Sequence, residues 1–486
     1  MTFGERRMLI DGKLVESSGG ATFDNVNPAT EEVIGVTADA TVDDARAAVD
    51  SARRAFDETG WASDPALRAR CLRQLQAAMV EARQELSDTL VAEAGSPVSL
   101  GPIIQLDLPV SWLEHWATVA ETYPYETALE PTRLFGQSHR GVQRREPIGV
   151  VTAITPFNYP VFVNIAKIGP ALAAGDTVVL KPSPDTPWSA TVLGRLAAEK
   201  TDIPPGVLNV VTSSSVEASE ALVTDPRVDM ITFTGSTATG RRIMHSCADT
   251  VKKCFLELGG KSANIVLEDA DFSLALALAA GWVCTHSGQG CAAYTRLLLP
   301  RTRYDEGVET VKGHFEAARV GDPTDPTILH GPQINRRQRE KVLGLISTGK
   351  QEGARLLVGG GTPPDLPRGF YVQPTLFTDV KPDMTIAQEE FFGPVLVVIP
   401  YDDVQDAVRI ANNSIYGLSG SVWSADEGRA LDVARRIRTG TVSVNGSQWL
   451  DKTRAFGGYK QSGVGRENGI EGFEEYLETK VVSLPG

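Results

Sequence analysis

Short apolar runs rich in β-branched residues alternate with helical segments from residue 147 onward, and this alternation constrains the fold more than any other feature. Each run is apolar throughout rather than at every second position, which is typical of strands buried on both faces of a parallel sheet. Helices must then cover both faces, so the pattern predicts an α/β fold with doubly wound sheets. The first such runs are 149–155, 177–181, 207–211, 229–234, 254–258 and 264–267.

The second half of the chain repeats the alternation, with strands predicted at 297–300, 355–360 and 394–400. A chain of 486 residues exceeds the usual size of one domain. We therefore predict two Rossmann-like α/β domains, the first ending near residue 259 and the second covering residues 260–460.

Three local patterns refine this prediction. Thr41 and Asp44 form a capping-box pattern that predicts a helix over residues 41–57. A longer helical stretch is predicted to open near Asp64 and to end at Gly95. The polar residues 133–146 predict a hairpin that turns at Arg140 and Gly141, which is either an arm for subunit contact or a plain surface hairpin.

Composition excludes several classes of partner. The net charge is −14 and the pI about 5.1, which argues against nucleic acid or an anionic membrane as a partner. Five sparse cysteines fit a reducing compartment, and none has the spacing of a zinc site, so no metal is predicted. The first residues do not resemble a signal peptide, and no run of eighteen apolar residues occurs. A cytoplasmic location without a membrane span is expected.

Polar residues and glycines follow three of the predicted strands, where an open parallel sheet binds its ligands. Lys181 and Ser183 follow the second strand, and the stretch GSTATG (235–240) follows a later one, before a helical run predicted to begin near Gly240. Glycine lets the backbone approach a phosphate, and a helix N-terminus supplies partial positive charge. The stretch is a candidate phosphate loop beside Lys181, and the alternative for Lys181 is a solvated surface lysine.

Two further stretches carry candidate chemistry. Cys291 lies in the glycine-rich SGQGCAAYTR, and a cysteine thiolate beside backbone donors is a nucleophile. Glu257 ends an apolar strand in LELGGKS, and burial raises the pKa of a carboxyl toward the range of a general base. The alternatives are a buried small apolar residue for Cys291 and a structural ion pair for Glu257.

Seven stretches together resemble the aldehyde dehydrogenase superfamily, in its order and with its spacing, from about residue 9 to the C-terminus. They are TPFNYP, KPSPDTP, FTGSTATG, LELGGKS, SGQGC, EEFFGPV and FGGYKQSG. The resemblance implies a hydrolytic, NAD(P)-dependent enzyme that oxidises an aldehyde to a carboxylic acid through a thioester. It also implies an NAD(P)-binding domain (1–124 and 147–259), a catalytic domain (260–460), and a small β oligomerisation arm (125–146 and 470–486) of a homodimer or homotetramer.

The resemblance assigns a role to single residues. The implied catalytic set is the nucleophile Cys291, the general base Glu257, the oxyanion-hole amide of Asn158 and a supporting Lys167. The implied cofactor-binding set is Thr155, Pro156, Phe157, Lys181, Ser183, Gly235, Ser236, Glu257, Gly259, Glu390 and Phe392. The implied substrate channel contains Tyr159, Gly290, Ala292 and Phe456.

Departures from the family pattern leave alternatives open. Pro184 stands where NAD-preferring relatives often have a glutamate, so NAD is favoured only because no second cation nearby would hold the phosphate of NADP. Small residues such as Ala166 and Gly290 indicate a roomy channel for a bulky apolar or aromatic aldehyde, whereas Lys452 and Arg454 would suit an acidic semialdehyde. Glu257 argues against a relative that acylates coenzyme A, and the complete residue set argues against a non-catalytic one.

Overall fold

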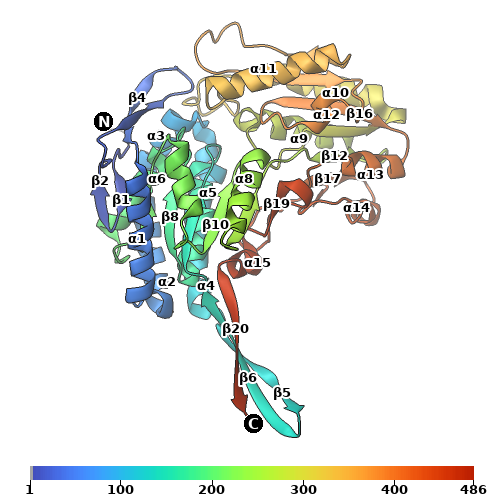
Figure 1. Ribbon diagram of the computed structural model, residues 1–486. Coiled ribbons are helices and arrows are strands. Elements are labelled where there is room, and N and C mark those ends of the chain that lie inside the picture. The colour runs from blue at the N-terminus through green and yellow to red at the C-terminus, as the bar shows by residue number, and fades with distance from the viewer. Residues whose placement is uncertain (1–3) are drawn as a thin grey trace.

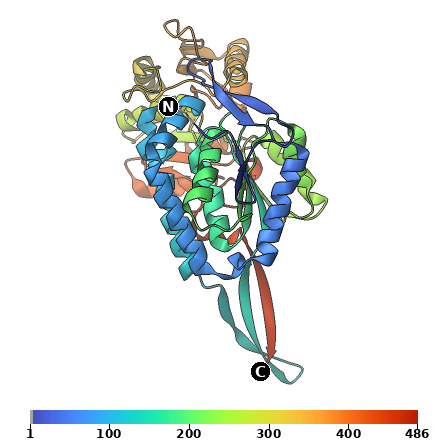
Figure 2. The same cartoon turned by 90° about the vertical axis from the view of Figure 1, so that its left-hand side faces the viewer.

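The structure is a computed structural model that describes residues 4–486. Its two large sheets lie side by side, each covered by helices on both faces, and a thin arm projects from the first (Figures 1 and 2). The predicted α/β class with two doubly wound domains and a β arm is confirmed.

Eight strands form the first sheet, and the five in its centre (β11, β10, β7, β8 and β9) run parallel. In sheet order the strands are β19 (Gly463–Val464), β11 (Lys253–Glu257), β10 (Met230–Thr234), β7 (Val150–Ile154), β8 (Thr177–Lys181), β9 (Leu208–Val210), β1 (Met8–Ile10) and β2 (Lys13–Val15). Strand β19 comes from near the end of the chain and pairs antiparallel with β11, so the first sheet is built from both ends of the sequence.

Apolar clusters lie on both faces of this sheet. One is covered by α2 (Pro65–Glu81), α4 (Asp107–Thr122), α5 (Pro160–Ala174) and α6 (Trp188–Lys200), and the other by α1 (Val42–Glu58), α7 (Val216–Thr224) and α8 (Thr237–Ala248). The buried Val and Ala side chains of β7 divide between the two clusters, which explains why four of its five residues are apolar.

The second sheet has seven strands, all parallel to their neighbours except the edge strand β14. Their order is β14 (Arg355–Val358), β15 (Thr375–Thr378), β16 (Val395–Tyr401), β13 (Arg296–Pro300), β12 (Ala263–Val266), β17 (Gly420–Trp423) and β18 (Ser443–Val444). The associated helices are α9 (Phe272–Cys284), α10 (Tyr304–Ala317), α11 (Arg336–Gln351), α12 (Thr385–Gln388), α13 (Val404–Asn412) and α14 (Glu427–Ala434).

The remaining elements lie outside the two large sheets. Strands β3 (Thr22–Val26) and β4 (Val33–Ala38) form a two-stranded sheet. The arm consists of β5 (Glu126–Leu134), β6 (Gln137–Pro147) and β20 (Leu477–Pro485), and α15 (Gly469–Glu474) leads into it. No helix of residues 4–486 is long and apolar enough to cross a membrane, and no cluster of three potential metal ligands occurs among them.

Local predictions had mixed outcomes. The capping box is confirmed, since Asp44 N donates to Thr41 Oγ1 at 3.1 Å and Thr41 N donates to the Asp44 carboxylate at 2.9 Å. The helical stretch that ends at Gly95 is broken at Ala82 into α2 and α3 (Arg83–Ala94). Helix α8 begins at Thr237, not near Gly240, because Ser236 caps it.

The predicted hairpin turn was misplaced. The chain reverses at Phe135 and Gly136, whose φ angles are +51° and +79°, as a tight turn between strands requires. Arg140 and Gly141 lie within β6, where the missing side chain of Gly141 gives room to Leu129 of β5.

Candidate active site

The nucleophile candidate Cys291 follows α9 through a tight turn and precedes β13. The turn, Thr285–Gly288, holds His286, Ser287 and Gly288 at positive φ. A Cβ on Gly288 would lie 2.2 Å from the carbonyl oxygen of Gly393, so this glycine lets the cysteine loop pack against the loop that follows Glu390 and Phe392.

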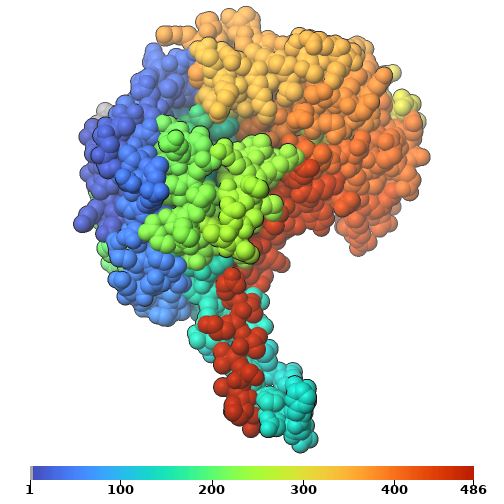
Figure 3. Space-filling view, in the orientation of Figure 1, coloured from blue at the N-terminus to red at the C-terminus, as the bar shows by residue number. Residues whose placement is uncertain are grey.

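The two glycines after Glu257 bring that strand end against the same loop. A Cβ on Gly260 would lie 2.4 Å from the carbonyl oxygen of Cys291, and one on Gly259 would lie 2.5 Å from the carboxylate of Glu390. The amide of Gly260 donates to that carboxylate at 2.8 Å. The structure therefore brings Glu257, Cys291 and Glu390 together. On the molecular surface, C-terminal residues lie between the two large parts of the molecule (Figure 3).

The electrostatics of this junction favour the protonated forms of Glu257 and Cys291. Glu257 is 1% exposed, and neither carboxylate oxygen has a hydrogen-bond partner within residues 4–486. Burial raises its pKa well above the ordinary value, and the charge of Glu467 adds to this, while the Lys167 ammonium opposes it. Burial likewise raises the pKa of the Cys291 thiol, and the charge of Glu257 raises it further. A thiol and a carboxyl that can each gain or lose one proton thus face each other.

Lys167, on α5, is fully buried and lies close enough to Glu257 for its charge to act on the pKa of that carboxyl. Its Nζ lies 2.8 Å from Glu467 Oε1 and 3.1 Å from Thr232 Oγ1, and it sits over the Phe255 ring. The prediction of a supporting lysine did not include its partner Glu467, because the two residues are 300 positions apart in sequence.

Asn158 lies between β7 and α5, with its side chain directed at the cysteine loop. Its Nδ2 donates to the carbonyl oxygen of Gln289 at 2.9 Å. The backbone carbonyl oxygen of Asn158 accepts from Gln105 Nε2 at 3.0 Å and lies 2.7 Å from His286 Nε2. The amide is thus held near the loop of Cys291, and an oxyanion hole at that residue would require such a donor.

Seven of the predicted cofactor residues lie at the carboxyl ends of β7, β8 and β10, whereas Glu257 and Gly259 lie at the end of β11 and Glu390 and Phe392 precede β16. Lys181 is 7% exposed, forms no ion pair within residues 4–486, and has its pKa lowered to about 8 by burial, against the opposing charge of Asp185. Ser236 is exposed at the N-terminus of α8 and accepts from Thr239 N at 3.2 Å, while Gly240 packs against Leu258. The second glycine of the stretch thus serves helix packing.

The other predicted cofactor residues at these strand ends are Thr155, Pro156, Phe157, Ser183 and Gly235. Thr155 points inward, donating through Oγ1 to Asn164 Oδ1 at 2.7 Å, so only its backbone can face a ligand. Phe157 meets Phe392 edge-on, with ring centroids 5.7 Å apart, and Pro156 beside it is partly exposed. Ser183 accepts from Asp185 N at 3.2 Å, and Gly235 N donates to the carbonyl oxygen of Glu257 at 3.0 Å.

Comparison with known proteins identifies the family. The model of the aldehyde dehydrogenase family matches residues 14–482. The chain is 43% identical to a 3-succinoylsemialdehyde-pyridine dehydrogenase of Pseudomonas over 98% of both chains, and 41% identical to the geranial dehydrogenase of Castellaniella defragrans over the whole of both. It also resembles the structure of a Mycobacterium tuberculosis aldehyde dehydrogenase complexed with NAD+, with TM-score 0.95 and 42% identity over 99% of both chains.

The chain belongs to the aldehyde dehydrogenase family. It is an NAD(P)-dependent oxidoreductase that acts on an aldehyde. Among the predicted residues of this aldehyde dehydrogenase, Tyr159 and Gly290 are neighbours, since a Cβ on Gly290 would lie 3.7 Å from the Tyr159 hydroxyl. Ala292 follows Cys291 and is partly exposed, and its backbone N–H acts to lower the pKa of the Cys291 thiol.

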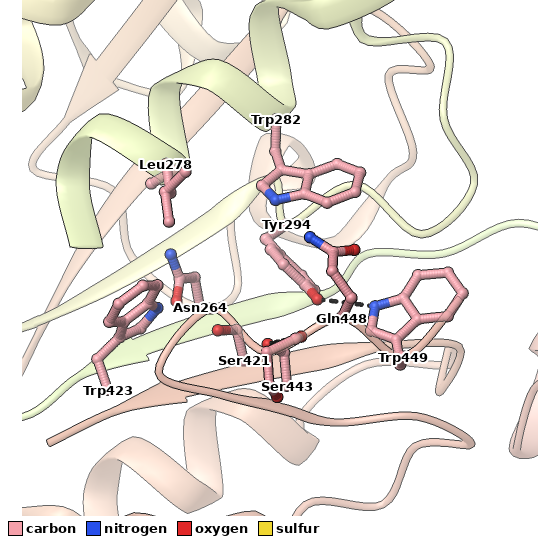
Figure 4. Close-up of a pocket in the computed structure, with 12 residues that line it drawn as sticks. Asn264, Leu278, Trp282, Tyr294, Ser421, Trp423, Ser443, Gln448 and Trp449 are labelled. Atoms are coloured by element: carbon pink, nitrogen blue, oxygen red, sulfur yellow. Dashed lines mark hydrogen bonds between the residues drawn. The ribbon is translucent and has the colours of Figure 1, made fainter. Parts of the chain in front are cut away.

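Aromatic residues that the sequence analysis missed surround the predicted channel of this aldehyde dehydrogenase. Trp449 stacks on Phe456 with ring centroids 4.9 Å apart, and its indole N–H donates to the Tyr294 hydroxyl at 3.1 Å (Figure 4). A separate apolar cluster contains Trp112, Phe162, Val163 and Ala166, with Ile104, Leu108, Tyr159 and Leu450 packed against it. Nothing in the local sequence marks Trp112 or Trp449, because each meets its partners only in the fold.

Proposed function

We propose that this enzyme oxidises a bulky apolar or aromatic aldehyde with NAD, through a thioester on Cys291. The observation that carries the proposal is the junction where Cys291 faces the buried, unpartnered carboxyl of Glu257. A buried carboxyl without a partner is costly unless it has a task, and transfer of a proton is such a task. The aromatic residues around Tyr159 and Phe456 support the choice of substrate class.

The proposed reaction begins when the Cys291 thiolate adds to the aldehyde carbon and places a negative charge on its oxygen. Asn158 Nδ2 and the backbone N–H of Cys291 would donate hydrogen bonds to that oxygen. NAD, when bound, supplies the acceptor for the hydride that leaves the same carbon. The Glu257 carboxylate would then take a proton from water, whose oxygen attacks the thioester, releasing the carboxylic acid and the Cys291 thiolate.

Residues at the ends of β8 and β10 fit the cofactor. Lys181 and Glu390 would hold a ribose, and the N-terminus of α8 with Ser236 would hold the pyrophosphate. The absent side chain of Gly259 keeps the backbone close to Glu390. We assign cofactor binding to residues 1–124 with 147–259, and catalysis to residues 260–460.

A carboxylate near Lys181 supports NAD over NADP. Pro184 removes the glutamate common in NAD-preferring relatives, but the next residue, Asp185, is held in place by Asn335 Nδ2 at 2.9 Å. Its charge reaches Lys181, where it raises the pKa of the amine. A fixed negative charge here disfavours the 2′-phosphate of NADP.

The named relatives support an apolar substrate. One is named for an aldehyde that carries a pyridine ring and another for geranial. The acidic semialdehyde alternative is weakened because Arg454, one of its two candidate cations, is exposed and donates to the carbonyl oxygen of Gln448.

Assembly and location extend the proposal. The arm leaves Val481, Val482 and Leu484 exposed at 60%, 37% and 39%, which supports a homodimer or homotetramer in which a second chain covers them. We propose a cytoplasmic location, which the free cysteines support.

A panel of aliphatic, aromatic and acidic aldehydes, each assayed with NAD and with NADP, tests the function. The expected result is formation of reduced cofactor, fastest with NAD and the bulky apolar aldehydes. Equal rates across the panel, or a preference for acidic aldehydes, would contradict the assignment of substrate class.

A further inference from the structure

His286 is a buried residue of the cysteine turn that has no role in the steps above. Its side chain is 1% exposed and its Nε2 lies 2.7 Å from the backbone carbonyl oxygen of Asn158. The ring also lies against Tyr159, with centroids 5.3 Å apart. A histidine therefore connects the nucleophile loop directly to the residue proposed to bind the oxyanion.

The backbone fixes the position of this ring. His286 and Ser287 have φ angles of +50° and +56°, a conformation unfavourable for residues other than glycine, although histidine is among those that adopt it more readily. Neighbouring groups hold it: His286 N donates to the Leu329 carbonyl at 2.7 Å, and Gln333 Nε2 donates to the Ser287 carbonyl at 2.8 Å. The strained turn places the imidazole at Asn158 and keeps it there.

Asn158 needs such support because it lies in the irregular segment between β7 and α5. Its side-chain amide donates to the Gln289 carbonyl, and its backbone carbonyl accepts hydrogen bonds from His286 and Gln105. Reorienting the backbone carbonyl of Asn158 would break both of these hydrogen bonds. Contacts to the backbone of Asn158 therefore fix the direction of its side-chain amide.

We infer that His286 is a positioning residue for Asn158, and this inference rests on the proposed role of Asn158 in the reaction. As the tautomer protonated at Nε2, His286 would donate to the Asn158 carbonyl and hold the side-chain amide where the oxyanion forms. Burial lowers the pKa of His286 to about 4, so the ring stays neutral near neutral pH.

A double-mutant cycle between H286F and N158A tests this inference. Phenylalanine keeps a ring of similar size and removes the donor. H286F alone is expected to lower kcat by about 10-fold to 100-fold through misplacement of the amide, with the KM for NAD unchanged. In the N158A background the same change should cost less than about twofold, because the residue through which it acts is gone.

Two further variants complete the design. H286Q keeps a donor on a side chain that can reach the carbonyl, and it should recover most of the kcat lost in H286F. H330F removes the other buried histidine of this region, whose Nε2 contacts Ser287 Oγ and the Val372 carbonyl at 3.1 Å but not Asn158. Its effect on kcat should be the same fold-change with and without N158A. Titration with NAD, followed by protein fluorescence, verifies that each variant is folded.

The outcomes separate the inference from the proposed function. An unimpaired N158A enzyme would remove the proposed role of Asn158, and the inference with it. A slow N158A enzyme combined with an equal cost of H286F in both backgrounds would overturn the inference alone. If H286F fails to bind NAD, H286Q decides: a kcat near that of the wild-type enzyme supports positioning by the donor, and a loss like that of N158A contradicts it.

Discussion

The site at Cys291 and the arm of β5, β6 and β20 are incomplete in opposite ways. The site buries polar atoms that have no hydrogen-bond partner within residues 4–486, above all both oxygens of Glu257. The arm exposes apolar side chains, including Phe135 at 95% and Val481 at 60%. An unpaired buried polar group costs several kcal/mol, and an exposed apolar patch marks a contact surface. We therefore expect a small molecule to bind at the site and a second chain to cover the arm.

The largest expected effect at the site is that of C291A, which should abolish formation of reduced cofactor, because the proposed thioester forms on this sulfur. C284A, at the nearby end of α9, is the matched control and should keep its activity because Cys284 is buried away from the junction. Rates of reduced cofactor formation, read from its absorbance, check both. Residual turnover in C291A would contradict the proposed thioester on Cys291.

E257Q should lower steady-state turnover by on the order of 10²–10⁴-fold, because no base remains to activate water. The first turnover should survive as a burst of about one reduced cofactor per site, measured by stopped flow. Since a base must be ionised, the raised pKa of Glu257 places the acid limb of the wild-type kcat profile above the pKa of an ordinary glutamate, with activity falling as pH drops. An acid limb unchanged in E257Q would assign it to another group.

N158A should lower kcat by on the order of 10²–10³-fold, the usual cost of losing one oxyanion donor. The KM for NAD should not change, because the side chain faces the cysteine loop. Single-turnover rates of hydride transfer give the measurement. A change confined to the KM for the aldehyde would show that Asn158 binds substrate without stabilising the transition state.

In the arm, V482D/L484D should lower the mass in solution toward that of one 52.2 kDa chain, because two carboxylates would lie on the proposed contact face. V482I/L484M, which keeps both side chains apolar, is the control and should assemble as the wild type does. Light scattering after size-exclusion chromatography gives the masses. Identical masses for both variants would place the subunit contact elsewhere.

The smallest effect is expected for P184E, which restores a second carboxylate beside Asp185. The ratio of kcat/KM for NAD to that for NADP should rise by about fivefold, equivalent to roughly 1 kcal/mol of repulsion between like charges near water. P184Q, similar in size and uncharged, should leave the ratio unchanged. Equal ratios for both variants would mean that residue 184 lies away from the ribose.

Features set by neighbours in sequence were predictable. The bounds of β8 match the apolar run 177–181, and the capping box at Thr41 depends only on Asp44. Strands β15 and β17 were missed because each has only four residues and no long apolar run. The hairpin turn was misplaced because Gly141 suggested a turn, whereas this glycine only makes room for Leu129.

The site divides in the same way. Sequence motifs were sufficient to predict Cys291, Glu257 and Asn158, because each lies beside glycines or prolines that mark a loop. Glu467 and His286 were not predicted, since their partners lie 300 and 128 positions away. Trp449 was missed for the same reason, as its hydroxyl partner Tyr294 belongs to the segment after the nucleophile.

The pairing of β19 with β11 also determines when the site can form during synthesis. Glu257 lies opposite Gly463 in this pairing, and the ribosome makes residue 463 only after almost the whole chain has emerged. Until then one edge of β11 is open, and an open strand edge is a template for pairing with other chains. A chain that stopped before residue 463 would contain the complete nucleophile loop, yet lack both the strand that closes β11 and the glutamate that pairs with Lys167.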